Sequence, residues 1–387
     1  MLKIRHYAKP QNVGGNGMKE DYCYICEMKT NELLDKYLID NDKIEPLFLN
    51  GDSFDVLKTF PDSTVDCIIT SPPYWGQRQY NGGGIGLEKT YNEYISNLML
   101  ITKELYRVLK DSGSFWLNIG DTYRNKNLLG IPWRTAIKLV DEQNWIIRNS
   151  IIWNKHKGGL DSSKDKLRNI HENIFHFVKN KKYYYETSQI RSDARKSIVK
   201  NGSVVSATGV SGVRYKRQIE LSTALTNDEK VLAFKALQDV LNKVKIGEIT
   251  DFRMIIRGQQ RVTHSDSKIV SGRAGELINK GFYFLFYHPD GTLPSDVWDI
   301  IPEDTQKRKE HYAVFPEDIC RIPILSTCPK NGVVLDPFSG SGTTSLVAFK
   351  EKRKSIGIDI SSDYIDISNE RINEYKFENS GVLQFLD

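Results

Sequence analysis

The sequence is poor in cysteine and contains no long hydrophobic run. Five cysteines in 387 residues are few and odd in number, so we expect reduced thiols rather than a disulfide scaffold. No apolar run approaches the roughly 18 residues that a membrane-spanning helix requires. The first stretch of the chain also lacks the apolar core of a secretory signal, which predicts a cytoplasmic protein.

The composition is that of a globular protein. Apolar residues make up 39% of the chain and charged residues 27%, which excludes a fully disordered chain and a collagen-like fibre. We find no internal repeat. The length suggests one large domain or two.

Positive charge is concentrated in one part of the chain. The net charge is only +5, but residues 187–296 contain 17 Lys and Arg against 11 Asp and Glu, whereas the remaining residues contain 37 against 38. A basic block favours a polyanionic partner. An accidental bias of a solvated surface is the alternative explanation when charge alone is considered.

Segments typical of strands and of helices alternate over most of the chain. Apolar, β-branched runs predict strands at 46–50, 65–70, 114–120, 146–155, 332–336 and 355–360, with a further pair of strand-like runs within 171–185. Helical spacing of apolar residues predicts helices at 91–110, 133–143, 343–353 and 362–376. This alternation predicts an α/β fold with a mostly parallel, twisted sheet.

The regular alternation stops between residues 187 and 296. Residues 187–215 lack periodicity and are interpreted as a loop or linker. A capping-box pattern at Thr226–Glu229 opens a helix. Its expected apolar face consists of Val231, Leu232, Phe234, Leu237, Val240, Leu241 and Val244. We therefore divide the chain into an N-terminal extension (1–45), two halves of one α/β domain (46–186 and 297–387) and an inserted region (187–296).

A glycine-rich turn lies directly between a predicted strand and a predicted helix. It reads DPFSGSGTT from Asp336 to Thr344, and its glycines Gly340 and Gly342 let the backbone approach a ligand closely. Asp359 ends the next strand, where a carboxylate can accept hydrogen bonds from both hydroxyls of a ribose. No Gly-Lys-Ser/Thr follows, so the turn is not a P-loop. The pattern indicates a nucleoside-cofactor site, with a purely structural turn as the alternative.

A second motif, Ser71-Pro72-Pro73-Tyr74-Trp75, follows the predicted buried strand at 65–70. The two prolines fix the backbone and remove two N–H donors. Carbonyl groups, a hydroxyl and an aromatic face remain, and these suit the exocyclic amine of a planar ring. A rigid Pro-Pro turn is the alternative interpretation.

Together, these motifs resemble those of the amino-methylating DNA methyltransferases of restriction–modification systems. TSPPYW (70–75) is similar to their catalytic motif, DPFSGSGTT to their S-adenosylmethionine loop, and HYAVFP (311–316) to a segment that lines the cofactor pocket. Further similar segments are NGDS (50–53), RNSIIWNK (148–155) and RNIHENIFHFVK (168–179). The catalytic motif precedes the cofactor loop, which is the order of the beta group. The resemblance covers about 46–185 and 297–376.

The resemblance implies a Rossmann-like methyltransferase fold, S-adenosylmethionine as cofactor and double-stranded DNA as substrate, with 187–296 as the target-recognition region. The catalytic residues that it implies are Ser71, Pro72, Pro73 and Tyr74. The implied cofactor-binding residues are Asp336, Phe338, Ser339, Gly340, Gly342, Thr343, Asp359, Ile360, His311 and Phe315. Contacts with DNA are expected from Asp52, Trp75, Arg257, Gln259 and Arg261. Trp75 either extends the stack on the flipped base or only forms a wall of the pocket, whereas Arg suits guanine and Gln suits adenine. A cognate restriction endonuclease would act as a separate protein, and a homodimer is left open.

The implied reaction is methylation of an exocyclic amine on a base that has flipped out of the duplex. Hydrogen bonds from the amine to Ser71 and Pro72 would free its lone pair and stabilise the positive charge that develops on nitrogen. Cys67 lies inside a strand and not in a Pro-Cys loop, which disfavours methylation at C5 of cytosine. N4 of cytosine is the expected target, because Ser at the first motif position is more typical of cytosine enzymes. Alternatives are N6 of adenine, an RNA or protein-glutamine methyltransferase, and a non-catalytic DNA-binding regulator.

Two weaker patterns are interpreted as structural. Cys23-x-x-Cys26 is half of a zinc-binding pattern, but no second close pair follows it, so no metal is expected. His171 and His176 lie in an aromatic, strand-like run and are expected in the core or at a strand edge.

Overall fold

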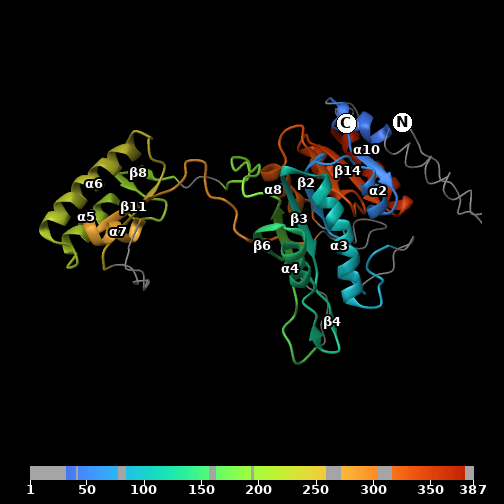
Figure 1. Cartoon of the computed structure of the whole chain (residues 1–387). Coiled ribbons are helices and arrows are strands. Elements are labelled where there is room, and N and C mark those ends of the chain that lie inside the picture. The colour runs from blue at the N-terminus through green and yellow to red at the C-terminus, as the bar shows by residue number, and fades with distance from the viewer. Residues whose placement is uncertain are drawn as a thin grey trace, which may run out of the picture. The chain divides into compact units, whose positions relative to one another are not determined.

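The computed structural model describes residues 32–40, 42–76, 84–156, 163–192, 196–258, 272–302 and 316–379. The chain forms two units, each of which has its own hydrophobic core (Figure 1). Unit 1 consists of 1–186 and 295–387, and unit 2 of 187–294. Among the helices that the structure describes, none is long and apolar enough to cross a membrane.

Unit 1 is built on an eight-stranded sheet. In spatial order its strands are β1 (Leu47–Asn50), β14 (Lys354–Asp359), β13 (Val333–Asp336), β2 (Val65–Thr70), β3 (Leu109–Ile119), β7 (His171–Val178), β6 (Ile146–Asn154) and β12 (Val297–Asp299). Of these strands only β7 runs opposite to the others, because its two pairings, with β3 and β6, are antiparallel and all other pairings are parallel. The prediction of an α/β fold with a mostly parallel sheet is confirmed.

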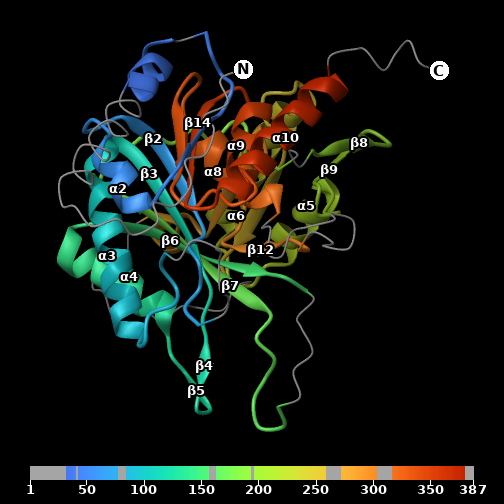
Figure 2. The same ribbon diagram turned by 90° about the vertical axis from the view of Figure 1, so that its right-hand side faces the viewer.

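Helices cover both faces of this sheet (Figure 2). Ile68 of β2 and Leu335 of β13 belong to the core cluster that includes helices α3 (Tyr91–Val108) and α4 (Ile131–Gln143). Their neighbours Cys67 and Val334 point the other way and pack with α8 (Glu317–Thr327) and α9 (Thr343–Lys350). The central strands are therefore buried on both sides, which is why they appear in the sequence as continuous apolar runs.

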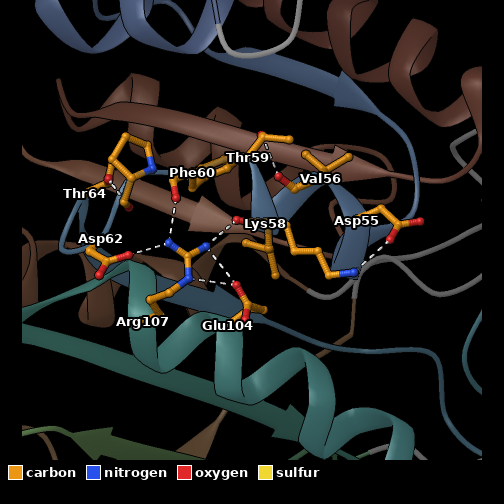
Figure 3. A network of polar contacts seen from close by, with 11 residues as sticks. Asp55, Val56, Lys58, Thr59, Phe60, Asp62, Thr64, Glu104 and Arg107 are labelled. Carbon is orange, nitrogen blue, oxygen red and sulfur yellow. Dashed lines mark hydrogen bonds and ion pairs between the residues drawn. The ribbon is translucent and has the colours of Figure 1, made fainter. Parts of the chain in front are cut away.

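An arginine network fixes the amino end of β2. Arg107, in the last turn of α3, donates to the carbonyl oxygens of Leu57 and Phe60 at 2.8 and 2.7 Å, and it forms ion pairs with Asp62 and Glu104 (Figure 3). These contacts join α3 to α2 (Ser53–Lys58) and to the turn that leads into β2. The network therefore lies at the opposite end of β2 from Thr70, its last residue.

In its described residues, unit 2 combines three helices with one β-hairpin, β8–β9, and a second antiparallel strand pair, β10–β11. Its elements are β8 (Ile198–Lys200), β9 (Ser203–Val205), α5 (Gly212–Leu221), α6 (Asn227–Lys245), β10 (Phe252–Ile256), α7 (Gly272–Lys280) and β11 (Phe282–Phe286). The capping box at Thr226 and Glu229 is present as predicted. The two ends of the unit are bonded to each other, since the backbone N–H of Ser192 donates to the carbonyl of Thr292 at 2.9 Å.

Three sequence-based predictions of local structure are corrected. Residues 187–215 are not a simple linker, because they contain the β8–β9 hairpin and the start of α5. Val231 and Leu232 do not belong to the buried face of α6, because they are 67% and 56% exposed. The aromatic run at 183–185 does not form a second strand, because the strand pairing of β7 ends at Val178. In the first two cases, tertiary packing decides the secondary structure and the buried face of segments that are short or weakly periodic in sequence.

Asp336 connects the ends of the two central strands. This residue is 1% exposed. Its Oδ1 accepts hydrogen bonds from Thr70 Oγ1 at 2.7 Å and from the backbone N–H of Phe338 at 3.1 Å, and its Oδ2 accepts one from Thr344 Oγ1 at 2.7 Å. Burial raises the pKa of Asp336 from 3.8 to about 6, even though these hydrogen bonds act in the opposite direction.

This raised pKa predicts a specific dependence of stability on pH. Between pH 4 and pH 6 the folded protein binds a proton at Asp336 more tightly than the unfolded chain does, so the contribution of Asp336 to stability falls as the pH rises. The quantity to compare is the free energy of unfolding of the wild type minus that of Asp336→Asn. We expect this difference to fall by about 3 kcal/mol between pH 4 and pH 6, because each pKa unit corresponds to about 1.36 kcal/mol. Above pH 6 the difference should become constant. Urea unfolding at several pH values measures the difference. The exposed Asp55→Asn is the control, and a difference that rises with pH would contradict the assignment.

Candidate active site

The predicted catalytic motif and the predicted cofactor loop meet at one edge of the sheet. Ser71 follows β2, the loop that begins at Pro337 follows β13, and Asp359 ends β14. These three strands are neighbours and run parallel, so their carboxyl ends lie at the same edge. The hydrogen bond between Thr70 and Asp336 holds the first two loops together.

Asp359 holds the cofactor loop in shape. Its Oδ2 accepts a hydrogen bond from the backbone N–H of Gly340, and its Oδ1 accepts one from Ser361, both at 2.8 Å. Asp359 is 9% exposed, and burial raises the pKa of its carboxyl. Each carboxylate oxygen keeps a lone pair that can accept a further hydrogen bond.

The loop between β13 and α9 has the features of a ligand cradle. Gly340 has φ +50°, and a Cβ placed there would meet no atom within 4 Å, so the backbone faces open space. Gly342 has φ +75°, and a Cβ there would lie 2.7 Å from Ser368 Oγ, so only glycine fits. The hydroxyl of Ser339 is buried and has no hydrogen-bond partner among the described residues. Open backbone and an unpaired polar atom fit a small polar ligand such as S-adenosylmethionine.

Other predicted cofactor residues have structural partners. Both carboxylate oxygens of Asp336 accept hydrogen bonds inside the protein, which gives this residue a structural role, and its contact with a cofactor stays a prediction. Thr343 Oγ1 accepts a hydrogen bond from Arg371 at 3.0 Å. Phe338 packs against the core of unit 1, and the carbonyl of Ile360 accepts from Asn50 Nδ2 at 3.2 Å. His311 and Phe315 lie outside the described residues, as do Cys23 and Cys26.

The catalytic motif forms a short, partly buried loop. Ser71 Oγ lies 3.2 Å from the hydroxyl oxygen of Tyr74. The tyrosine ring fits against Gly120, where a Cβ would lie 2.6 Å from Cε2. Trp75 is 6% exposed, and its indole N–H donates to the carbonyl of Glu88 at 2.9 Å. Trp75 therefore forms a wall of the site and does not present a free ring to a base.

Three residues that the sequence analysis missed complete the site. Asn118 lies near the carboxyl end of β3, Glu172 at the amino end of β7, and Lys155 directly after β6. Glu172 Oε2 accepts hydrogen bonds from the Tyr74 hydroxyl at 2.6 Å and from Asn118 Nδ2 at 2.9 Å, and Glu172 Oε1 pairs with Lys155. Burial, followed by the charge of Glu172, raises the pKa of Tyr74 well above its ordinary value. Asn118 and Lys155 lie at the carboxyl ends of β3 and β6, and the reversed direction of β7 brings its amino end, with Glu172, to the same edge.

Two of the residues expected to contact DNA have other partners. Asp52 is the N-cap of α2 and accepts from the backbone N–H of Phe54 at 2.9 Å. Arg257 donates to the carbonyl oxygens of Ala224, Leu277 and Ile278 and pairs with Glu229, so its guanidinium stabilises unit 2. Gln259 and Arg261 lie outside the described residues.

His176 and His171 are expected in the core or at a strand edge, and His176 is a core residue. His176 is fully buried and stacks on Trp116, with ring centroids 4.0 Å apart. Its Nε2 lies 3.0 Å from Ser114 Oγ, and burial lowers its pKa from 6.5 to about 3. An imidazole that stays neutral at physiological pH in the core has no acid–base role at this site. His171 is exposed at the start of β7.

Comparison with known proteins identifies the family. The family model described as DNA methylase matches residues 65–370. The Type II methyltransferase M.SfiI of Streptomyces fimbriatus is 29% identical over 376 residues, which cover 81% of this chain and 88% of that protein. M.SmaI of Serratia marcescens is 28% identical over 352 residues, covering 83% and 89%.

A solved structure shows the same fold. The PvuII DNA methyltransferase, which is named as cytosine-N4-specific, superposes with a TM-score of 0.50 and 16% identity over 85% of this chain and 90% of that one. The predicted methyltransferase fold is therefore confirmed. The chain belongs to the DNA methylase family.

Proposed function

We propose that this protein is a site-specific methyltransferase that transfers a methyl group to the exocyclic N4 of cytosine in double-stranded DNA. The observation that carries the proposal is the hydrogen bond that joins Thr70 to Asp336. It places the acceptor groups of Ser71 and Pro72 beside the loop that has the open backbone of Gly340 and the unpaired hydroxyl of Ser339. A site for an amine and a site for a methyl donor are thereby adjacent.

The residues of the chain have distinct roles in this reaction. S-adenosylmethionine supplies an electrophilic methyl group when it is bound. Ser339, Gly340 and Asp359 hold this cofactor through hydrogen bonds, with the Asp359 carboxylate suited to ribose hydroxyls. Ser71 Oγ and the Pro72 carbonyl accept the two N–H groups of the target amine, which directs its lone pair toward the methyl carbon. Holding two reactants in such an orientation is worth up to about 7–11 kcal/mol of the barrier.

The choice of cytosine rests on Ser71. A serine places no formal negative charge at the first position of the motif, and the same preference for cytosine N4 is part of the name of the PvuII enzyme that shares the fold. N6 of adenine is the second candidate, because the same pair of acceptors fits its amine. The intact motifs and cradle do not favour a non-catalytic regulator, and the separate basic unit does not favour an RNA or protein-glutamine methyltransferase.

We further propose that the enzyme belongs to a restriction–modification system, with a separate endonuclease that cuts the unmethylated site. The support is that the relatives M.SfiI and M.SmaI are named Type II methyltransferases and align over more than four-fifths of this chain. A homodimer remains a prediction from the sequence.

Unit 2 is proposed as the target-recognition region. It contains a cleft of about 720 Å³, whose lining includes Arg214, Arg217 and Gln218 from α5. Arg214 and Arg217 are exposed, and neither has an ion-pair partner among the residues that the structure describes. Gly258 also lines the cleft, and Gln259 and Arg261 follow it directly in the sequence. Arg257 lines the same cleft, but its guanidinium already donates to backbone carbonyls and to Glu229, so we expect Arg214 and Arg217 to be the main arginine contacts with DNA.

The double variant Arg214→Ala/Arg217→Ala tests this role. We expect it to weaken DNA binding and to reduce the slope of log affinity against log salt by about one to two, because two phosphate or base contacts are lost. Titration of a labelled duplex at several salt concentrations measures both quantities. Lys235→Ala/Lys245→Ala removes the same charge from exposed positions of α6 that do not line the cleft. Equal effects of the two double variants would remove the cleft from the recognition role.

Asp359→Ala tests the cofactor site. We expect it to weaken binding of S-adenosylmethionine by about 1.5–3 kcal/mol, because a charge-assisted hydrogen bond is lost. Isothermal titration calorimetry measures the affinity, and circular dichroism checks that the fold is retained. An unchanged affinity would refute the assignment of Asp359 as a cofactor ligand.

The identity of the methylated base is tested directly. DNA treated with the purified protein and S-adenosylmethionine is digested to nucleosides and analysed by mass spectrometry. We expect N4-methylcytosine, and we expect Ser71→Ala to lower the methylation rate far more than it lowers DNA affinity. Finding N6-methyladenine alone would show that the argument from Ser71 is wrong and would leave amine methylation standing.

A further inference from the structure

A partly buried carboxylate lies behind the proposed catalytic serine. The side chain of Glu172 is 12% exposed and is contacted by Tyr74, Asn118 and Lys155. Each of these partners comes from a different segment of the sheet edge. Glu172 lies in the segment RNIHENIFHFVK (168–179), far along the chain from Ser71 and Tyr74, yet it is one hydrogen bond from Tyr74 and two from Ser71.

The chemistry of a carboxylate gives this chain of hydrogen bonds a direction. An ionised carboxylate only accepts, so the Tyr74 hydroxyl donates its proton to Glu172, at 2.6 Å. The tyrosine oxygen is then free to accept from Ser71 Oγ, at 3.2 Å. With its own proton turned toward Tyr74, Ser71 presents a lone pair to the target amine. Without Glu172, the serine hydroxyl could point either way.

Asn118 supports the same direction. Its Nδ2 lies 2.9 Å from Glu172 Oε2, so the donor end of the amide faces the carboxylate, and it also lies within reach of Tyr74 and Ser71, at 3.0 and 3.2 Å. Its Oδ1 is buried and has no hydrogen-bond partner among the described residues. An unpaired buried acceptor is costly, which fits a pocket that is completed by a donor from the substrate.

We propose that Glu172 is a positioning residue that orders this chain of hydrogen bonds and receives, through it, the proton that the target amine loses. The inference rests on the proposed amine methylation at Ser71. As the nitrogen–carbon bond forms, the electron pair of the carbon–sulfur bond stays with sulfur. The amine proton passes to Ser71 Oγ, the serine proton to Tyr74, and the tyrosine proton to the Glu172 carboxylate. Every proton and electron pair is then accounted for without a further reactant.

A purely structural role for Glu172 is the competing explanation. Glu172 pairs with Trp153 in the ladder between β6 and β7, and its ion pair with Lys155 could simply hold these strands together. A structural ion pair would affect stability and act independently of the Tyr74 hydroxyl. A residue that acts through Tyr74 would depend on that hydroxyl entirely.

Single-turnover methylation by Glu172→Gln, Tyr74→Phe and the double variant separates these explanations. We expect each single variant to slow the methyl-transfer step by about 10²-fold, the low end for general acid–base effects, with affinities for DNA and S-adenosylmethionine within about twofold of wild type. The double variant should be no slower than Tyr74→Phe, because both changes interrupt one path. Penalties that multiply, or an active Glu172→Gln, would overturn the proposal.

Glu104→Gln is the matched control. It makes the same chemical change in an ion pair of unit 1, with Arg107, that lies at the opposite end of β2 from Ser71. We expect it to leave the single-turnover rate unchanged.

A second readout requires neither cofactor nor DNA. Titration of tyrosines labelled with ¹³C at Cζ, with the Tyr74 signal assigned by its loss in Tyr74→Phe, reports ionisation of the Tyr74 phenol. In the described structure, the titratable groups that raise the pKa of Tyr74 are Glu172 and Tyr94. Removing the negative charge in Glu172→Gln should therefore lower the pKa of Tyr74. An unchanged titration would overturn the coupling. If the wild type methylates no exocyclic amine, the proposed function fails while this titration still reports on the chain of hydrogen bonds.

Discussion

The active-site edge of unit 1 depends on one buried carboxylate. Asp336 receives hydrogen bonds from Thr70, which precedes the proposed catalytic serine, and from Thr344, in the first turn of the helix that follows the proposed cofactor loop. Methyl transfer requires that the groups that bind the amine and the loop that binds the methyl donor keep a fixed position relative to each other. Burying a carboxylate is costly, as the raised pKa of Asp336 shows, and the three donors around it offset part of that cost.

The sequence predicted those parts of the site that are contiguous in the chain. The segments TSPPYW and DPFSGSGTT each contain their functional groups within a few residues, next to strands whose continuous apolar runs are easily recognised. The parallel arrangement then places both segments at one edge. Fold class and the location of the two motifs could therefore be inferred without coordinates.

Residues whose roles depend on distant partners could not be predicted in this way. Glu172 and Lys155 lie in the quoted segments RNIHENIFHFVK and RNSIIWNK. The sequence does not show that Glu172 contacts both Tyr74 and Lys155, because these contacts depend on the reversed direction of β7 and its pairing with β6. Arg257 was misinterpreted for a related reason. A positive side chain in a basic region suggests a contact with DNA. The hydrogen bonds of Arg257 instead go to the carbonyls of Ala224, Leu277 and Ile278, and no sequence pattern reveals these partners. Likewise, an aspartate at position 336 suggests a contact with the cofactor, whereas its hydrogen bonds with Thr70 and Thr344 join two parts of the protein.

The closed ends of unit 2 have a consequence for how such proteins diversify. Ser192 and Thr292 are bonded through backbone and side chains, and Arg191 donates to the carbonyl of Gly291 at 2.8 Å, so the polypeptide enters and leaves the unit at nearly one point. An insertion with adjacent ends adds little loop-closure entropy to its host. The host sheet can therefore accept exchange of the whole insertion as a unit. Under the proposed role of unit 2 in target recognition, such an exchange would change the DNA sequence preference and leave the chemistry of unit 1 intact.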